Sequence, residues 1–321
     1  MSVSPYVLPF PEIVRIEPSA ACNLKCLHCP TGTVAMPRGV MAEQTFDLVL
    51  SQIRSHTIRV AVLFHSGEPL INNRFPSMIK RVKALGIPFV KTVSNGMLLT
   101  DTIIEELIDS GLDLIEISLD GESKAENDFI RRGCDFDMVV GNVKRFIAAK
   151  KRRKTNLPKI EITSTLFMSA GQAEPDSAVC PVPAFIANAF EGQTEIDFKP
   201  TWAYIWPDLP IDDEVFSADK GTGATVNYCS QVHNNLNVCW NGDVVACCYD
   251  LTGKMVLGNI HNDSLETIWN NHAYQALRRS IDEMRFCDMC KNCTEVNPGV
   301  RLRLKPGVVA DAVAMAAARG R

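Results

Sequence analysis

Apolar stretches typical of buried β-strands recur along the chain as far as Trp202. Each contains a run of Val, Ile, Leu or Phe, and most end in polar or glycine-rich residues. We expect strands over residues 12–18, 59–67, 88–96, 112–121, 159–167 and 194–202.

The segments between these strands repeat apolar residues at three- and four-residue spacing, which is typical of amphipathic helices. We expect helices over residues 42–55, 75–86, 99–111 and 137–151. Thr100 or Asp101 can cap the third helix, and Gly86 and Gly111 stand where glycine commonly ends a helix. Alternating strands and helices with short links predict a parallel sheet with right-handed crossovers.

In such sheets, functional residues gather at the carboxyl ends of the strands. The first four predicted strands end in "CNLKCLHC" (22–29), "HSGEP" (65–69), "SNG" (94–96) and "SLDG" (118–121). We therefore expect candidate site residues to meet at one edge of the sheet.

The alternation of predicted strands and helices ends near residue 208. Residues 208–225 are acidic, contain Gly and Pro and show no period, which predicts a linker or lid. A hairpin over 236–248 that turns at Asn241 and Gly242 is expected next, followed by a helix over 264–284 capped by Ser264 or Asp263. The expected organisation is a barrel core at 1–207, the linker at 208–225, a small α+β domain at 226–298, and a tail at 299–321 with a short helix.

Composition and charge narrow the function classes. The formal net charge of -4 gives no electrostatic reason to expect nucleic acid or an anionic membrane as the main partner. Residues 1–15 lack a basic leader, and Pro5, Pro9 and Pro11 interrupt any apolar run, so we expect neither a signal peptide nor a membrane span. We expect a cytoplasmic protein whose substrate is a small molecule or a peptide.

The 12 cysteines are the strongest chemical signal. In a reducing compartment their clustering indicates metal binding rather than disulfides. Cys22, Cys26 and Cys29 have the spacing Cys-x3-Cys-x2-Cys, and three thiolates from one loop can ligate three irons of a 4Fe-4S cluster while leaving the fourth iron open. A zinc site is the alternative, but it would need a fourth ligand, and His28 is wedged between two of the cysteines.

This loop resembles the signature of the radical S-adenosylmethionine (radical SAM) enzymes, an α/β family with a partial (β/α)6 TIM-like barrel. The resemblance implies that S-adenosylmethionine binds the open iron, and that an electron from the cluster cleaves it to methionine and a 5'-deoxyadenosyl radical. This radical abstracts a hydrogen from the substrate, while the protein supplies binding, orientation and exclusion of water. The resemblance also implies a reducing partner such as a flavodoxin or ferredoxin.

Three further motifs agree with the resemblance, namely "SGEP" (66–69), "SNG" (94–96) and "SLDG" (118–121). "SGEP" looks like the family's Gly-Gly-Glu-Pro element, whose backbone and glutamate would meet the ammonium group of the cofactor. Ser118 and Arg131 are candidates for the methionine carboxylate, with Asp120 or Asn95 for nearby polar contacts. Taken alone, a Ser-Gly-Glu-Pro sequence is commonly only a turn. Arg131, next to Arg132, would commonly be a solvated residue on a helix surface. The resemblance thus implies as cofactor-binding residues Ser66, Gly67, Glu68, Pro69, Ser94, Asn95, Ser118, Asp120 and Arg131.

The C-terminal cysteines resemble the SPASM or twitch extension of the same family. "CKNC" (290–293) is similar to its closing cysteine pair, and "VLGNIHNDSLETIWN" to the stretch between its ligands. The resemblance implies one auxiliary 4Fe-4S cluster, because the cysteine run ends at Cys293 and ligands for a second cluster are missing. A zinc ribbon is the alternative. The expected ligands are Cys229, Cys247, Cys290 and Cys293, with Cys287 as an alternative and Cys239 and Cys248 unassigned.

A cluster held by four thiolates can accept an electron from a substrate radical. Asp250 is a candidate base for the accompanying proton, although an aspartate after a hairpin is often a turn former. We expect a radical SAM oxidoreductase acting on a small molecule such as a sugar or aminocyclitol alcohol, and the short segment before Cys22 favours this class. A peptide or protein maturase is the alternative, and a non-catalytic metal-binding interaction protein is the second alternative.

Overall fold

The computed structural model describes residues 4–169, 180–207, 209–219, 224–297 and 301–319. A nine-stranded sheet runs through it in the order β11-β10-β9-β1-β2-β3-β4-β5-β7. Its strands are β1 (Ile13–Ile16), β2 (Val60–Val62), β3 (Phe89–Ser94), β4 (Leu114–Ser118), β5 (Lys159–Leu166), β7 (Ile196–Trp202), β9 (Asn235–Val238), β10 (Asp243–Val245) and β11 (Val256–Asn259).

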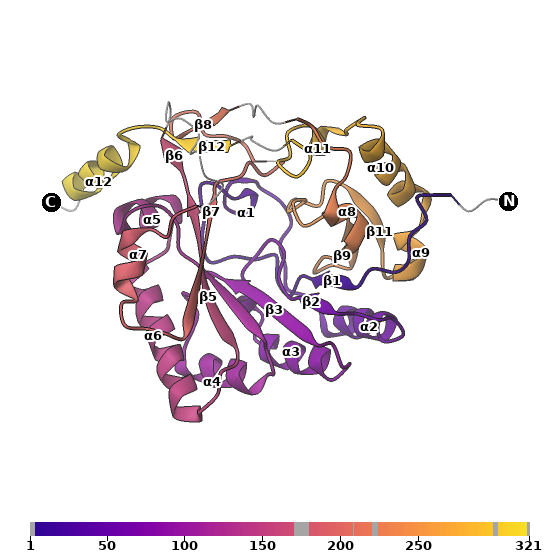
Figure 1. The fold of residues 1–321 in the computed structure, drawn as a ribbon, viewed down its shortest axis with the longest axis horizontal. Coiled ribbons are helices and arrows are strands. Elements are labelled where there is room, and N and C mark those ends of the chain that lie inside the picture. Colours follow the sequence, from indigo (N-terminus) through magenta and orange to yellow (C-terminus); the bar gives the residue numbers. More distant parts are fainter. Residues whose placement is uncertain (1–3, 170–179, 208, 220–223, 298–300, 320–321) are drawn as a thin grey trace.

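The parallel part of this sheet confirms the predicted partial barrel. The six strands expected from the apolar pattern are β1 to β5 and β7, and neighbours pair in parallel. Figure 1 shows these strands fanning out, with α2, α3, α4 and α6 following one another along the outer side. The helices of the barrel are α2 (Glu43–Ile53), α3 (Phe75–Lys83), α4 (Asp101–Asp109), α5 (Lys124–Ile130), α6 (Phe136–Arg153) and α7 (Ala184–Ala189).

Local signals in the sequence set the ends of these helices. The Thr100 hydroxyl accepts the Ile103 N–H and caps α4, as expected. Gly86 and Gly111 follow α3 and α4 with a positive φ of 81°, a conformation that other residues adopt at a cost. Alternate residues of the strands, such as Ile115 and Ile117 of β4, are fully buried in the core.

The C-terminal unit extends the barrel sheet. β9 pairs in parallel with β1, which places Asn237 beside Arg15, and β10 and β11 continue the sheet in antiparallel pairing. The predicted hairpin is confirmed and turns at Gly242, where φ is +88°. The strands of the two units therefore share one sheet, and the domain boundaries given above stay a prediction.

The helix expected over residues 264–284 is wrong in one respect, because it is two helices. α9 (Leu265–Trp269) is capped by Ser264, and α10 (His272–Asp282) is capped by Asn271, whose side chain accepts the Tyr274 N–H at 2.9 Å. Asparagine side chains compete with helical backbone hydrogen bonds and favour caps. The apolar period continues across this break, so the pattern alone did not indicate it.

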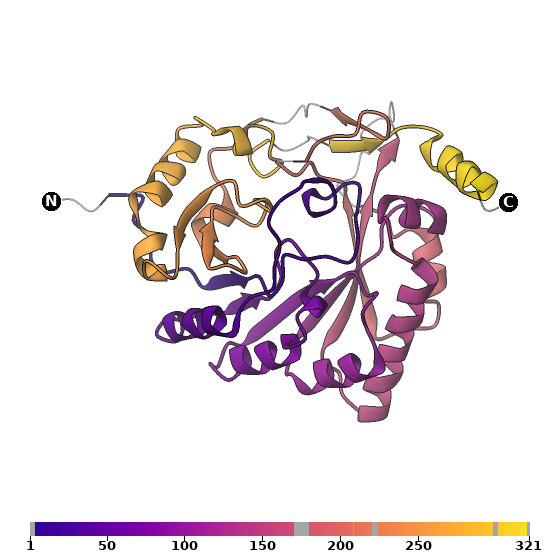
Figure 2. The ribbon, with the colours of Figure 1, turned by 180° about the vertical axis from the view of Figure 1, so that it is seen from behind.

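The remaining elements lie at the carboxyl end of the barrel and around the second unit. A three-stranded sheet in the order β6-β12-β8 joins the linker to the tail (Figure 2). The predicted tail helix is α12, whereas residues 208 and 220–223 of the linker and 299, 300, 320 and 321 of the tail lie outside the described residues. These elements are α1 (Pro30–Thr33), η1 (Pro69–Ile71), β6 (Met168–Ser169), β8 (Phe216–Asp219), α8 (Ser230–Asn234), α11 (Asp288–Lys291), β12 (Arg301–Leu304) and α12 (Val308–Arg319). None of the described helices has the length and apolar character needed to cross a membrane.

Candidate active site

The three N-terminal cysteines lie on the loop between β1 and α1, residues 17–29, which we call the cysteine loop. All three are partly exposed, and the Cys22 Sγ accepts the Leu24 N–H at 3.4 Å. The loop is held by backbone bonds to the end of α5, from Lys25 N–H to the Arg132 carbonyl at 2.9 Å and from the Leu27 N–H to the Ile130 carbonyl at 2.8 Å. The thiols are therefore carried by a fixed loop at the carboxyl edge of the sheet.

Two glycines allow the backbone to pack tightly here. A Cβ atom at Gly67 would lie 2.3 Å from the Ser19 carbonyl oxygen, and one at Gly32 would lie 2.4 Å from that of Cys26. The N–H of Glu68 also donates to the Ala21 carbonyl at 2.8 Å. The "SGEP" turn thus lies directly against the start of the cysteine loop, and a side chain at Gly67 would displace one of them.

Glu68 joins the ends of β2 and β3. Its buried carboxylate accepts hydrogen bonds from the Leu70 N–H at 3.1 Å, the Ser94 hydroxyl at 2.9 Å and the Asn95 N–H at 2.8 Å. Burial raises the pKa of Glu68, although these bonds and the charge of Arg131 act against the shift. A carboxylate has about four acceptor positions, so one remains for a further donor.

Asn95 and Ser66 extend this network on either side. The Asn95 amide donates to the Asn23 side-chain oxygen at 2.8 Å and lies 4.0 Å from the Cys22 Sγ. The Ser66 hydroxyl and N–H both donate to the Glu17 carboxylate. Ser118 is half-buried, with its hydroxyl 3.5 Å from that of Thr163.

Asp120 and Arg131 form a buried ion pair next to the cysteine loop. The Arg131 Nη1 lies 2.6 Å from Asp120 Oδ2, and His28 Nε2 lies 3.6 Å from the same oxygen. Burial acts to raise the pKa of Asp120, but the charges of Arg131 and His28 and the hydrogen bonds from Arg131 and Thr165 together outweigh it, so the pKa is lowered. Arg131 is only 7% exposed and its Nε is buried without a partner, so the alternative of a solvated helix residue is wrong. The sequence nominated both residues but not their pairing.

The C-terminal thiols expected to hold the auxiliary cluster lie together. Cys229 precedes α8, Cys247 follows β10, and Cys290 and Cys293 lie in and after α11, yet all four are buried. Burial, followed by the neighbouring thiols of Cys248, Cys293 and Cys229, raises the pKa of Cys247. Backbone N–H groups point at the sulfurs of Cys229, Cys247 and Cys293. Such bonds are one of the means by which proteins tune cluster potentials.

The three other cysteines of this region differ in their surroundings. Cys287 shares a hydrogen bond with Cys290, which lowers the pKa of Cys287 to about 6 and raises that of Cys290. The Cys248 thiol donates to the Gln231 side-chain oxygen at 3.2 Å. Cys239 is hydrogen-bonded to Glu17 instead. The choice of four ligands, with Cys287 as an alternative, stays a prediction.

Both sets of thiols suit iron-sulfur clusters. A zinc site would need its ligands to converge on one metal ion. A cubane cluster instead takes each thiolate at its own iron. Burial raises the pKa of Cys26 and Cys293 to about 12, so these thiols are protonated and unreactive until a metal deprotonates them.

Asp250 organises the loop between β10 and β11, residues 246–255, which we call the auxiliary loop. Its fully buried carboxylate accepts the N–H groups of Lys254 at 2.8 Å and Met255 at 2.9 Å. Its own carbonyl oxygen lies 3.0 Å from the Nε2 of the buried His65. His65, the first residue of "HSGEP", therefore links the two units, a contact that the sequence did not predict. The role of Asp250 as a base stays a prediction.

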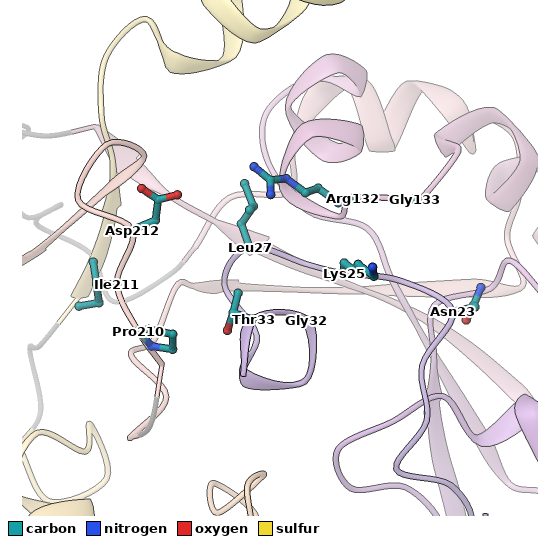
Figure 3. A pocket seen from close by; sticks show the side chains of 10 residues that line it. All are labelled: Asn23, Lys25, Leu27, Gly32, Thr33, Arg132, Gly133, Pro210, Ile211 and Asp212. Atoms are coloured by element: carbon teal, nitrogen blue, oxygen red, sulfur yellow. The ribbon is translucent and has the colours of Figure 1, made fainter. Parts of the chain in front are cut away.

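A pocket of ≈ 700 Å³ lies beside the cysteine loop. Figure 3 shows Lys25 and Leu27 of that loop, Thr33 of α1, and Asp212 of the linker across from them, with Arg132 above. Lys25 and Arg132 are exposed, and neither forms an ion pair within the part of the chain that the structure describes. The pocket therefore offers two exposed cations, Lys25 on the loop that carries the three thiols and Arg132 beside that loop.

Comparisons with known proteins agree with this site. A model of the radical SAM superfamily matches residues 16–162, and a model of the SPASM iron-sulfur cluster-binding domain matches residues 229–294. Mycofactocin maturase MftC of Mycolicibacterium smegmatis is 24% identical over 310 residues, which cover 89% of this chain and 76% of that protein.

Solved structures share the fold. BtrN in complex with AdoMet and 2-DOIA is 17% identical with a TM-score of 0.56, covering 90% of this chain and 95% of that one. Native anSMEcpe with bound AdoMet and Cp18Cys peptide is 15% identical with a TM-score of 0.59, covering 91% and 92%. At these identities the likeness establishes the architecture of barrel and C-terminal unit.

Proposed function

Because the chain belongs to the radical SAM superfamily and carries a C-terminal SPASM iron-sulfur cluster-binding domain, we propose that it is an oxidoreductase with one auxiliary 4Fe-4S cluster. The observation that carries this proposal is the set of four buried thiols, Cys229, Cys247, Cys290 and Cys293, on a unit that shares the barrel sheet. Four protein ligands leave no open iron, which suits electron transfer better than substrate binding.

Cys22, Cys26 and Cys29 would hold the catalytic 4Fe-4S cluster. With S-adenosylmethionine bound, this cluster supplies the chemistry that abstracts hydrogen from a substrate. The protein contributes a rigid frame for the cofactor, since Glu68 and Asn95 fix the ends of β2 and β3 beside Cys22. Arg131, held by Asp120 and with a free Nε, supplies a fixed cation for a carboxylate.

We favour a small-molecule substrate with a secondary alcohol, such as a sugar or aminocyclitol. The full-length likeness to BtrN, which was solved with 2-DOIA, supports this class, because 95% of that chain is covered. A peptide substrate is the second candidate, supported by the match of MftC over 89% of this chain and by the peptide-bound anSMEcpe structure. Asp250 is the proposed base in either case.

We further propose that a cytoplasmic reducing protein such as a flavodoxin or ferredoxin delivers electrons at the pocket beside the cysteine loop. Lys25 lies between Cys22 and Cys26, so a donor that contacts Lys25 and Arg132 would lie close to the catalytic thiols. Exposed, unpaired cations favour a partner with acidic groups around its redox centre.

Anaerobic reconstitution tests the cofactor content, and about eight irons per chain are expected for two 4Fe-4S clusters. Zinc without a visible absorption band would overturn the proposal. Deuterated alcohols and deuterated peptides, supplied in parallel, should then separate the two substrate classes. Transfer of deuterium into 5'-deoxyadenosine from the alcohols alone supports the small-molecule class, and transfer from the peptides alone replaces it with the second candidate.

A further inference from the structure

Arg15 is a largely enclosed cation without an acidic partner in contact. It lies on β1, its Nη1 donates to the Phe64 carbonyl at 3.1 Å, and its guanidinium carbon lies 4.8 Å from the centre of the Phe64 ring. Its Nε is buried and has no hydrogen-bond partner. In the described part of the chain Arg15 forms no ion pair. A buried charge that is not neutralised destabilises a protein, so a counter-charge is expected nearby.

The barrel wall does not provide that counter-charge. Glu116 is the carboxylate whose field acts on Arg15, but its Oε1 lies 2.8 Å from the Lys91 Nζ and 3.2 Å from the Lys199 Nζ. Two lysines therefore already share this carboxylate, and Arg15 adds a third positive charge to the same interior.

Arg15 instead faces the auxiliary loop. It stands in register with Asn237, and Asn237 with Val245, which precedes Cys247 by two residues. The guanidinium rests on the carbonyl of Phe64, and the next residue, His65, contacts the auxiliary loop at Asp250. Burial lowers the pKa of Arg15, and the strongest opposing influence comes from Cys248, with a further one from Cys247.

We propose that Arg15 is the fixed counter-charge of the auxiliary cluster and raises its reduction potential. This rests on the proposed function, since it requires the cluster at Cys229, Cys247, Cys290 and Cys293. Thiolate-ligated 4Fe-4S clusters carry net negative charge, which grows by one on reduction, so a nearby cation stabilises the reduced form more. The substrate radical would lose one electron to this cluster and one proton to a base, and Arg15 makes the electron transfer more favourable.

A redox titration followed by electron paramagnetic resonance tests the proposal. The full-length chain with Cys22, Cys26 and Cys29 replaced by Ala keeps only the auxiliary cluster, so its signal is measured alone. Arg15→Met should lower the midpoint potential by about 59 mV, a tenfold change in the one-electron equilibrium constant. Arg15→Lys keeps the positive charge, so its midpoint potential should lie close to that of the parent. Lys83→Met is the matched control, because it removes a partly buried barrel cation that pairs with Asp113 and not with Glu116, and it should leave the potential unchanged.

A second measurement needs no cluster. In the metal-free full-length chain, Arg15→Met should be as stable to urea as the parent or more stable, because it removes a largely enclosed charge that has no ion pair within the described residues. With the auxiliary cluster bound, Arg15→Met should instead be less stable to urea than the parent. Equal midpoint potentials for the parent and Arg15→Met, or an equal shift in Lys83→Met, would overturn the counter-charge role. Failure of the parent chain to bind any auxiliary cluster would instead overturn the proposed function.

Discussion

The carboxylate of Glu68 accepts the hydroxyl of Ser94 at 2.9 Å, and this bond ties the end of β2 to the end of β3. The same carboxylate reaches Asn95, whose amide lies beside Cys22. The candidate cofactor residues are thus one connected network rather than separate loops.

Glu68→Gln should weaken both the fold and cofactor binding. The glutamine amide would place a donor against the N–H groups of Leu70 or Asn95, and an unsatisfied buried N–H costs roughly 1–3 kcal/mol. We expect a loss of that size in the free energy of unfolding of the metal-free chain, and weaker S-adenosylmethionine binding after reconstitution. Glu12→Gln, at an exposed pair with Arg59, is the control and should change neither. Unaltered urea unfolding and binding in Glu68→Gln would contradict this reading.

Asp120→Asn should destabilise the chain in a pH-dependent way. The substitution leaves the charge of Arg131 buried without its partner. We expect this to lower the free energy of unfolding by roughly 3–5 kcal/mol near neutral pH. The folded-state pKa of Asp120 is lowered, so its contribution is complete above the ordinary aspartate pKa of about 3.9 and is lost as pH falls through the folded value. Urea unfolding of the metal-free parent and variant should therefore converge as pH drops below about 4. A difference that stays constant down to acid pH would show that the pair is not the cause.

Substitutions in the two sets of cysteines should have different effects on the reaction. Cys26→Ala should abolish dithionite-driven formation of 5'-deoxyadenosine, because a ligand of the catalytic cluster is lost. Cys290→Ala should still form 5'-deoxyadenosine but give no oxidised product. Chromatography of both products from one reaction checks this, and full turnover by Cys290→Ala would refute the electron-transfer role of the auxiliary cluster.

Replacing the two pocket cations by glutamate should slow the reaction only when a protein delivers the electrons. For Lys25→Glu combined with Arg132→Glu, we expect 5'-deoxyadenosine formation driven by reduced flavodoxin to fall about tenfold at low salt, because electrostatic steering raises association rates by 10-fold or more. The dithionite-driven rate should stay near that of the parent. Lys80→Glu, an exposed position on α3, is the control. Equal losses with both reductants would indicate damage to the cysteine loop instead of a docking surface.

The sequence predicted what depends on local pattern. The strands follow from runs of apolar residues such as Ile115 and Ile117, and the start of α4 follows from Thr100, whose cap involves a residue three positions away. The break at Asn271 was missed because apolar spacing continues through it, although two adjacent asparagines are a usable signal.

Contacts between distant segments could not be predicted in the same way. Asp120 and Arg131 were nominated separately, but their ion pair depends on how α5 returns to β4. The bond between His65 and Asp250 joins residues 185 positions apart, and no pattern in one sequence specifies such a pairing. The role proposed for Arg15 could not be predicted either, because an arginine in a strand is ordinary in a sequence until the structure shows which carboxylates lie near it.

The parallel pairing of β9 with β1 has a consequence for how the chain can be divided. Without the C-terminal unit, β1 would become an edge strand with a free row of N–H and C=O groups, and such edges recruit other chains. A barrel cut after residue 207 is therefore expected to self-associate rather than to persist as a monomer. The C-terminal unit therefore has a structural role as well, because its strand β9 covers the edge of β1.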